Sequence, residues 1–237
     1  MARRILMYSG GLDSFILKYL YKFADDECLF VDVGTADCRK ERQLVETYFP
    51  PMRIISLPLA QWELQNKIIP FRNHFLSLVA AQYASEIYFG FTAGDTTLDK
   101  DIVFQNQMSN VLTYFASGPV GKMPLSVNSP IRILMPYKEQ TKTELVRAYL
   151  AAGGDEEALD YVSRSCYSGE HVSHCGECRS CLRRFVALKL NGIYRGTEFK
   201  KDPVYGLREF YLECVRKDRN IKELQEVAEC LKLVGLS

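Results

Sequence analysis

The chain has 237 residues, of which 47% are hydrophobic and 25% are charged, and its formal net charge is +1. This composition is typical of a globular protein and excludes disordered and fibrous classes. A net charge this small gives no general attraction to nucleic acid or to a membrane surface. No stretch approaches 18 consecutive apolar residues, and Met1-Ala2-Arg3-Arg4 leads straight into an apolar run. We therefore expect a cytoplasmic protein without a signal peptide or membrane span.

Short apolar runs alternate with helical patterns through the first two thirds of the chain. The runs lie at residues 5–8, 28–33, 54–57, 87–91 and 131–135. Runs of this length predict strands that are buried on both faces of a parallel sheet. Helical patterns lie at residues 15–23, 39–48, 73–85, 102–115 and 141–152. The alternation predicts an α/β fold with a doubly wound parallel sheet and right-handed crossovers.

The first predicted strand runs into the hexapeptide Ser9-Gly10-Gly11-Leu12-Asp13-Ser14. A strand, a glycine turn and a helix start bring unpaired N–H groups and the positive end of a helix dipole together, and these bind phosphate. Gly10 and Gly11 lack a Cβ atom, so the backbone can approach an anion closely. Ser9 and Ser14 add hydroxyl donors. The loop lacks the lysine of the ordinary P-loop, and the alternative interpretation is a plain glycine turn.

Four of the eight cysteines cluster with the spacing C-x8-C-x2-C-x2-C, at Cys166, Cys175, Cys178 and Cys181. Clustered cysteines of this kind indicate a metal site in a reducing compartment rather than disulfides. Four thiolates can surround one zinc ion tetrahedrally and leave no open position, so the spacing predicts a structural Zn²⁺ site. An iron–sulfur cluster, or a ligand contributed by His171 or His174 in the same loop, is the alternative.

Gly153-Gly154 ends the last helix of the α/β pattern. The chain therefore divides into an α/β domain, residues 1–154, and a zinc-binding and helical region packed on it, residues 155–237. Further helices are predicted at residues 182–190, 207–217 and 221–233. The apolar positions of the last two have helical spacing, and packing onto the chain's own domain is their default explanation.

The hexapeptide matches the S-G-G-x-D-S pyrophosphate loop of the PP-loop ATP pyrophosphatase superfamily, which has a Rossmann-like fold. Together with the cysteine spacing, it makes the chain resemble the 7-cyano-7-deazaguanine synthase family. Ile69-Pro70-Phe71-Arg72-Asn73 is similar to the helix start V-P-x-R-N of that family, and Thr141-Lys142-Thr143-Glu144 is similar to its T-K-x-E. The pattern of that family is also matched by Gly90, by Gly94-Asp95 and by Ser165-Cys166-Tyr167. The resemblance covers residues 5–190.

This resemblance implies an ATP-dependent ligase. Such an enzyme adenylates 7-carboxy-7-deazaguanine, releases pyrophosphate, adds ammonia to form an amide, and uses a second ATP to convert the amide to the nitrile. A Mg²⁺ ion between Asp13 and the phosphates would relieve their repulsion, although Asp13 could simply cap the following helix.

The residues implied fall into three groups. The expected catalytic residues are Asp13, Ser14, Arg72 and Lys142. The expected ATP contacts are Met7, Tyr8, Ser9, Gly10, Gly11, Leu12, Asp13, Ser14 and Val33. The expected substrate contacts are Phe71, Arg72, Asn73, Phe91, Gly94, Asp95 and Tyr167. The resemblance also implies a homodimer, and we expect a face of the C-terminal helices at its two-fold contact.

Two segments depart from the family pattern. Residues 33–38 read V-G-T-A-D-C where the family has Y-G-Q-x-H, and residues 97–102 read T-L-D-K-D-I where it has G-Y-P-D-C-R. The departures leave ATP use intact but put the later steps in doubt. One alternative is a ligase of an antiviral or DNA-modification system that couples the same acid to another amine, such as one on a protein. Others are a tRNA-modifying PP-loop enzyme, which would need a basic patch such as Arg179, Arg183 and Arg184, and a non-catalytic zinc-stabilised module.

Overall fold

The computed structural model describes residues 3–117, 130–166, 174–196, 199–217 and 220–236. Within these residues, five parallel strands form one sheet in the order β3-β2-β1-β4-β5. They are β1 (Arg4–Met7), β2 (Cys28–Asp32), β3 (Arg53–Ser56), β4 (Glu86–Phe89) and β5 (Arg132–Leu134). At the centre of the sheet, Met7 pairs with Leu29 on one side and with Phe89 on the other. The predicted α/β class and parallel sheet are confirmed.

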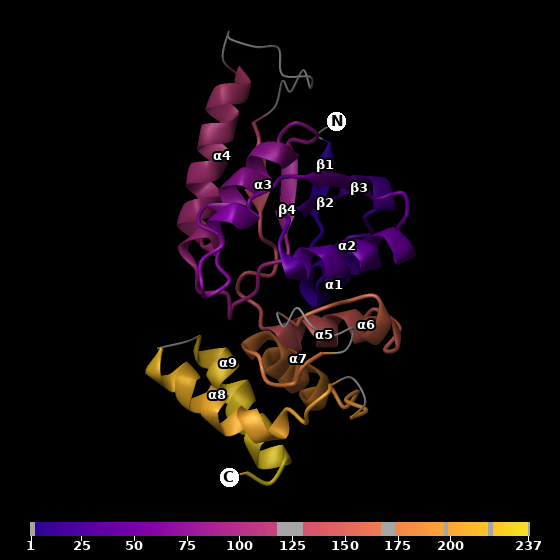
Figure 1. Cartoon of the computed structure of the whole chain (residues 1–237), viewed down its shortest axis with the longest axis vertical. Helices are drawn as coiled ribbons and strands as arrows, with labels where there is room; N and C mark the ends of the chain where they lie inside the picture. The colour runs from indigo at the N-terminus through magenta and orange to yellow at the C-terminus, as the bar shows by residue number, and fades with distance from the viewer. Residues whose placement is uncertain (1–2, 118–129, 167–173, 197–198, 218–219, 237) are drawn as a thin grey trace.

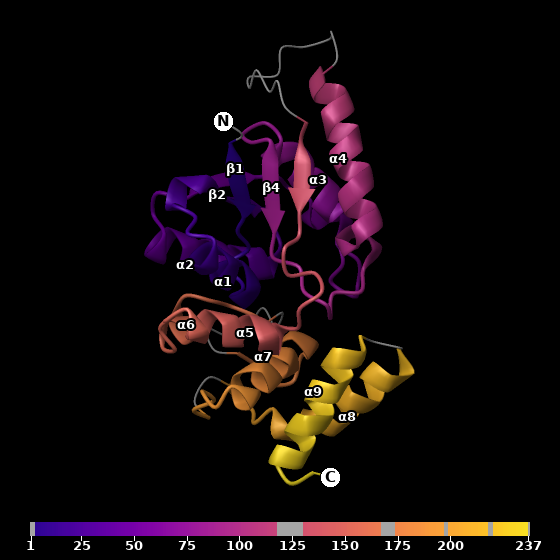
Figure 2. The same ribbon diagram turned by 180° about the vertical axis from the view of Figure 1, so that it is seen from behind.

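Helices cover both faces of the sheet. Their bounds are α1 (Leu12–Leu20), α2 (Ala36–Tyr48), α3 (Arg72–Ala80), α4 (Ile102–Ser117), α5 (Lys142–Ala151), α6 (Ala158–Tyr161), α7 (Arg179–Leu190), α8 (Val204–Arg216) and α9 (Ile221–Leu233). The short 3₁₀ helices are η1 (Asp25–Glu27), η2 (Ala60–Trp62) and η3 (Leu98–Lys100). Figures 1 and 2 show α1 and α2 on one face of the sheet and α3 and α4 on the other. This arrangement follows from right-handed crossovers on either side of β1.

Several helix boundaries differ from the predictions: α1, α7 and α8 each begin three residues earlier than predicted. Two further differences have clear local causes. α2 begins three residues before the predicted start at residue 39, because the Thr35 hydroxyl accepts a hydrogen bond from the Cys38 backbone N–H at 3.3 Å and caps the helix. α3 ends at Ala80 and not at residue 85. Beyond its end, Gln82 and Tyr83 donate hydrogen bonds to carbonyls three residues back, which tightens the chain into a turn before β4.

Two groups of buried apolar side chains hold the chain together. The larger lies around the sheet and includes Leu6, Leu29 and Ile87, none of which is exposed to solvent. It extends past the predicted boundary at residue 154, to Leu159 on α6 and Leu188 on α7. The smaller group lies between α7, α8 and α9 and contains the buried side chains Cys166, Cys181, Leu182, Phe185, Val186, Phe199, Leu207, Phe210, Cys214, Val227, Cys230 and Leu231. The apolar faces of α8 and α9 thus pack within their own chain.

The carboxyl ends of the strands point toward the C-terminal half of the molecule. In Figure 2, β4 and β5 run toward α5, α6 and α7, which lie beyond that edge of the sheet. The strand order reverses at β1, with β2 on one side and β4 on the other. Ligands of open α/β sheets bind in the crevice outside the carboxyl ends at such a reversal. None of the helices in the described ranges is long and apolar enough to cross a membrane.

Candidate functional site

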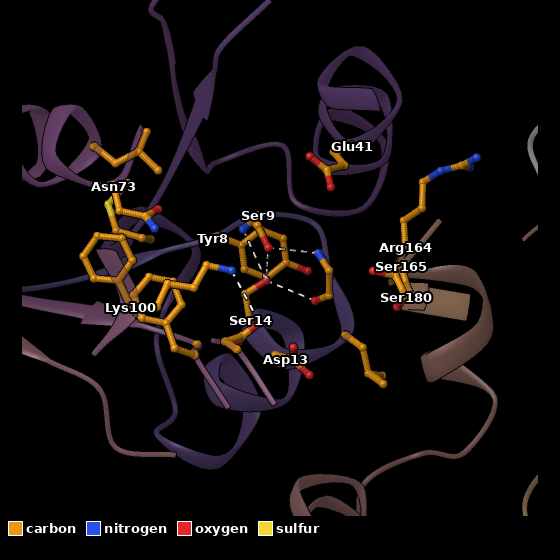
Figure 3. Close-up of a pocket in the computed structure, with 18 of the residues that line it drawn as sticks. Tyr8, Ser9, Asp13, Ser14, Glu41, Asn73, Lys100, Arg164, Ser165 and Ser180 are labelled. Atoms are coloured by element: carbon orange, nitrogen blue, oxygen red, sulfur yellow. Dashed lines mark hydrogen bonds and ion pairs between the residues drawn. The ribbon is translucent and has the colours of Figure 1, made fainter. Parts of the chain in front are cut away.

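A pocket occupies this crevice. Its walls come from the carboxyl ends of β1, β2 and β4, the start of α1, one side each of α2, α3, α5 and α7, and the segment at residues 164–165 (Figure 3). Elements far apart in sequence therefore meet there. The short parallel bridge between Gly11 and Arg164, with the Arg164 N–H donating to the Gly10 carbonyl at 2.7 Å, ties the region before the cysteine cluster to the loop.

The hexapeptide at residues 9–14 forms a tight loop that is organised by its two serines. Gly10 has a φ of +72°, which favours glycine because a Cβ atom is strained there. The Ser9 and Ser14 hydroxyl oxygens are 3.1 Å apart, and the Ser14 hydroxyl donates to the Gly11 carbonyl at 3.0 Å. The Gly11 N–H in turn donates to the Ser9 hydroxyl oxygen at 3.3 Å. These contacts hold both hydroxyls at the mouth of the loop.

The start of α1 faces the pocket. The helix begins at Leu12 after Gly11, and no side chain caps it. Its first N–H groups therefore have no partner within the helix, as at any helix start. Gly90, at the end of β4, allows the sheet to approach this start closely, because a Cβ atom there would come within 3.1 Å of the Ser14 backbone nitrogen. The site thus presents backbone donors and a positive dipole end to the crevice.

Lys142 reaches the same loop from α5. Its ammonium group forms an ion pair with the Asp13 carboxylate, and the Lys142 side chain is only 10% exposed. Burial lowers the pKa of Lys142, although the negative charge of Asp13 opposes this. Thr141 and Glu144 form a reciprocal capping box at the start of α5, so the lysine stands on a firmly fixed helix end.

A second group of charges surrounds Asp95. Arg183 on α7 contacts Asp95 at 3.5 Å and donates to the Thr92 hydroxyl at 3.0 Å, and Lys100 lies 3.4 Å from the same carboxylate. Burial of Asp95 would raise its pKa, but the charges of Lys100 and Arg183 outweigh burial and hold the pKa well below its ordinary value. Arg183 also forms an ion pair with Glu223 of α9 at 2.5 Å. α9 thereby holds a side chain that lines the pocket, although α9 itself does not line it.

The structure brings most of the predicted residues together. All four predicted catalytic residues line the pocket, and so do all of the predicted ATP contacts except Gly10. Of the predicted substrate contacts, Arg72, Asn73, Phe91 and Asp95 line it. Phe71 is 68% exposed and contacts the His74 ring instead. Gly94 does not line the pocket; it lies against the side chains of Arg183 and Glu223. Tyr167 lies outside the described residues.

Several lining residues were not predicted. They are Phe30, Val31, Cys38, Glu41, Leu76, Phe89, Gly90, Lys100, Arg164, Ser165, Ser180 and Arg183. Val33, Cys38 and Lys100 belong to the two segments that depart from the family pattern, so both segments do border the pocket. The Asn73 side-chain amide donates to the Asp99 carboxylate at 2.8 Å, which ties the second of these segments to the start of α3.

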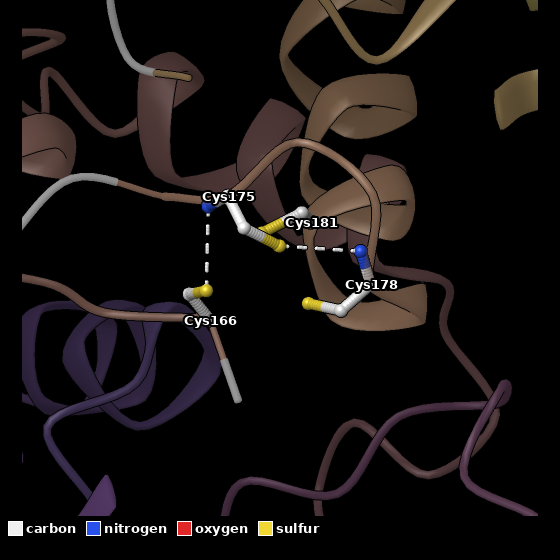
Figure 4. Close-up of side chains that lie close together, drawn as sticks. All are labelled: Cys166, Cys175, Cys178 and Cys181. Atoms are coloured by element: carbon white, nitrogen blue, oxygen red, sulfur yellow. Dashed lines mark hydrogen bonds between the residues drawn. The ribbon is translucent and has the colours of Figure 1, made fainter. Parts of the chain in front are cut away.

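The four clustered cysteines converge on one point (Figure 4). Their sulfur atoms all lie within 4.8 Å of one another, and the Cys175 and Cys181 sulfurs are 3.8 Å apart. A tetrahedral ion with zinc–sulfur bonds of about 2.3 Å needs sulfurs about 3.8 Å apart. Backbone N–H groups of Glu177 and Cys178 donate to the Cys175 sulfur at 3.4 Å and 3.3 Å, which favours a thiolate.

The surroundings of the cysteines also fit a metal ion. Hydrogen bonds with Cys166 and Cys178, and after them burial, raise the pKa of the Cys181 thiol. Because this opposes loss of the thiol proton, four thiolates at this point would need a cation among them. His174 does not belong to this group of converging ligand atoms, and its Nε2 atom accepts a hydrogen bond from the Ser165 N–H at 3.2 Å. His171 lies outside the described residues. The four cysteines could therefore hold a metal ion, as the spacing predicts.

Comparison with known proteins identifies the family. The family model for the queuosine biosynthesis protein QueC matches residues 50–192, more than half of the chain. The chain belongs to the QueC family. Similar QueC-family proteins include a 7-cyano-7-deazaguanine synthase of Psychromonas ingrahamii, 25% identical over 84% of this chain and 96% of the relative. A 7-cyano-7-deazaguanine synthase of Porphyromonas gingivalis is 26% identical over 83% of this chain and 96% of the relative. One of Methanosarcina barkeri is 32% identical over 57% of this chain and 52% of the relative. The resemblance derived from the motifs is confirmed.

Proposed function

We propose that the protein is an ATP-dependent carbon–nitrogen ligase that adenylates the carboxyl group of 7-carboxy-7-deazaguanine. The observation that carries the proposal is the meeting of the Ser9–Ser14 loop and the start of α1 with Lys142, Arg72 and Arg183 in one pocket. Uncapped helix N–H groups and cations suit a triphosphate and a carboxylate. Membership of the QueC family, whose relatives are named 7-cyano-7-deazaguanine synthase, supports the choice of substrate.

In this proposal, the loop and Lys142 stabilise the charge that develops on the departing pyrophosphate. Asp13 would hold a Mg²⁺ ion between itself and the phosphates, a step in which its ion pair with Lys142 would loosen. Arg72 would bind the substrate carboxylate, and Phe91 would stack on the purine-like ring. The four cysteines would bind a structural Zn²⁺ ion, which stands outside the chemistry because four protein ligands leave it no open position.

Ammonia would then convert the acyl adenylate to an amide, and a second ATP would allow the amide to lose its oxygen and form the nitrile. A second candidate shares the first step but transfers the acid to a different amine, such as one on a protein. The observation that favours it is the position of Val33, Cys38 and Lys100, from the two divergent segments, in the pocket wall. A changed wall can admit a different amine without altering the phosphate loop.

The structure gives little support to the tRNA-modifying alternative. Of the three arginines of the expected basic patch, Arg184 is fully buried and its guanidinium group bonds Ser163 and the Leu159 carbonyl. Arg183 is buried against Glu223, and only Arg179 is substantially exposed, where it pairs with Glu213. These residues therefore offer no continuous positive surface to a phosphate backbone.

An ATP–pyrophosphate exchange assay tests the proposal. We expect exchange that depends on 7-carboxy-7-deazaguanine and not on tRNA. Mass analysis after incubation with ATP, the acid and ammonia then identifies the product: a nitrile indicates the synthase reaction, whereas accumulation of adenylate or a protein adduct indicates the second candidate. Absence of exchange with the acid would contradict the proposed function.

A further inference from the structure

Glu41 is a carboxyl group in the pocket that the adenylation step described above does not use. It lies on α2, where Cys38, Glu41 and Val45 follow one another at helical spacing. Cys38 and Val45 are both buried and Glu41 is half-buried, so Glu41 stands on the side of the helix that faces the rest of the protein. Acidic side chains are seldom placed there, because burying a carboxylate without a partner is costly. The position indicates a role in the pocket.

The carboxyl group of Glu41 lies beside the phosphate loop. A Cβ atom added to Gly10 would come within 3.2 Å of the Glu41 Cβ atom. Figure 3 shows the carboxyl group of Glu41 directed from α2 toward the pocket, with Arg164, Ser165 and Ser180 to the right in this view and Asn73 and Lys100 across on the left. Within the described ranges, the carboxyl group of Glu41 forms neither a hydrogen bond nor an ion pair. Its oxygens are thus available to a bound molecule.

The electrostatics of the site suit a proton acceptor. Burial raises the pKa of Glu41 to about 8; the positive charges of Arg72 on α3 and of Arg164 oppose the shift, and Asp37 on α2 reinforces it. Near neutral pH the group is therefore mostly uncharged, so a substrate carboxylate can bind nearby without repulsion. A pKa close to the working pH is also what makes a general base effective.

We propose that Glu41 is the general base that takes the proton from the amine attacking the acyl adenylate; the inference rests on the proposed function. The amine nitrogen forms a bond to the carbonyl carbon, the bond from that carbon to the AMP oxygen breaks, and AMP leaves with the electron pair. The proton released by the nitrogen passes to the Glu41 carboxylate and then to solvent. Arg72, the proposed carboxylate contact, acts electrostatically on Glu41, which is consistent with both groups serving the same end of the substrate.

The experiment separates the two half-reactions in the full-length protein. Exchange of pyrophosphate into ATP with 7-carboxy-7-deazaguanine measures adenylation, and mass analysis of the amide formed from ammonia measures nitrogen transfer. We expect Glu41→Gln to keep exchange within about threefold of the unmodified protein and to lower amide formation by about 100-fold or more. Glu41→Asp should retain part of the nitrogen transfer. The matched control is Glu46→Gln on the same helix, where the side chain is 50% exposed and pairs with Arg42; it should change neither rate.

The pH dependence distinguishes a base from a structural residue. The carboxylate fraction of Glu41 rises as the pH passes upward through its pKa, so the amidation rate of the unmodified protein divided by that of Glu41→Gln should rise between pH 7 and pH 9. The titration of ammonia cancels in this ratio. Unchanged amidation in Glu41→Gln, equal loss of exchange and amidation in both Glu41 variants, or a ratio that does not vary with pH would overturn the inference alone. Absence of acid-dependent exchange in the unmodified protein would overturn the proposed function, and the inference with it.

Discussion

The ion pair between Asp13 and Lys142 joins two distant parts of the chain at the Ser9–Ser14 end of the pocket. The two residues are 129 positions apart in the chain, and their ion pair links α1 to α5. Burial lowers the pKa of Lys142, and the negative charge of Asp13 opposes that effect. Asp13 therefore favours the charged form of the lysine.

At this scale we predict that Ser14→Ala and Asp13→Ala each lower acid-dependent ATP–pyrophosphate exchange by at least about tenfold. Ser14→Ala removes a hydroxyl from the loop, and Asp13→Ala removes both the proposed magnesium ligand and the partner of Lys142. The melting temperature of Ser14→Ala should stay close to that of the unmodified protein. Asp26→Ala, at an exposed position of η1, is the control. Full exchange activity in both loop variants would show that the loop does not hold the pyrophosphate.

At the level of elements, the cysteine cluster and the C-terminal helices form one unit beside the site. Cys178 precedes α7, and Cys181 lies in its first turn. The same helix carries Arg183 to the pocket, while α9 supplies Glu223 to hold that arginine. A Cβ atom at Gly94 would press on the ends of both side chains, so a larger residue there would displace this ion pair. A metal at the cysteines would thus fix the helix on which a pocket residue stands.

We predict one zinc ion per chain, measured by elemental analysis of protein purified without added metal. Cys178→Ser should lose the zinc and aggregate or unfold, because the metal would contribute to folding. Cys28→Ala, which removes a buried cysteine outside the cluster, should keep the zinc. Iron in place of zinc, or a soluble, folded and metal-free Cys178→Ser protein, would contradict the structural zinc site.

A second prediction at this scale concerns α9. Glu223→Gln should weaken the hold on Arg183 and raise the KM for the acid or for ATP by several-fold, since Arg183 would turn toward Asp95 alone. Glu229→Gln, at an exposed position on the same helix, should leave both KM values unchanged. Steady-state kinetics of the two variants provide the measurement. Equal behaviour of the two variants would mean that α9 does not position the pocket arginine.

For the whole molecule, we propose a homodimer, and the structure narrows where its contact could form. A face of the C-terminal helices is expected at the two-fold contact, but Leu207, Phe210 and Cys214 on the apolar face of α8 are buried against their own chain. Exposed apolar side chains remain on α8, including Leu212 at 51%, and on α4, including Tyr114 at 74%. α4 carries no charged residue over its 16 positions. Both helices therefore offer apolar surface to a second copy.

We expect light scattering at micromolar concentration to give the mass of a dimer. If Leu212 lies at the two-fold contact, Leu212→Arg should reduce the mass to that of the monomer, and if Tyr114 lies there, Tyr114→Arg should do so. The reason is that a buried charge without a partner is unfavourable at an interface. The other variant serves as the control, since each site is exposed in the monomer and should tolerate arginine. A monomeric mass for the unmodified protein would refute the prediction.

The sequence by itself determined the features that depend on neighbouring residues. The apolar runs predict the five strands, because a strand buried on both faces is apolar throughout. The Ser9–Ser14 loop and the cysteine cluster are recognisable because their chemistry lies within a few consecutive residues. The predicted start of α2 and the predicted end of α3 were wrong by three and five residues, since side-chain caps and turns decide these boundaries and leave only weak patterns.

Only the tertiary structure decided which distant residues share the pocket. Glu41 on α2, Arg164 in a loop, and Ser180 and Arg183 on α7 come from three separate parts of the chain. No pattern in the chain relates these parts before the sheet and α7 are packed together. Glu41 alone left a local signal, as an acid in the buried stripe of α2. Phe71 stood in a matching motif, yet its backbone adopts a φ of +58° before α3 and its ring is exposed. Motifs fix the chemistry available to a site, whereas packing fixes which side chains reach it.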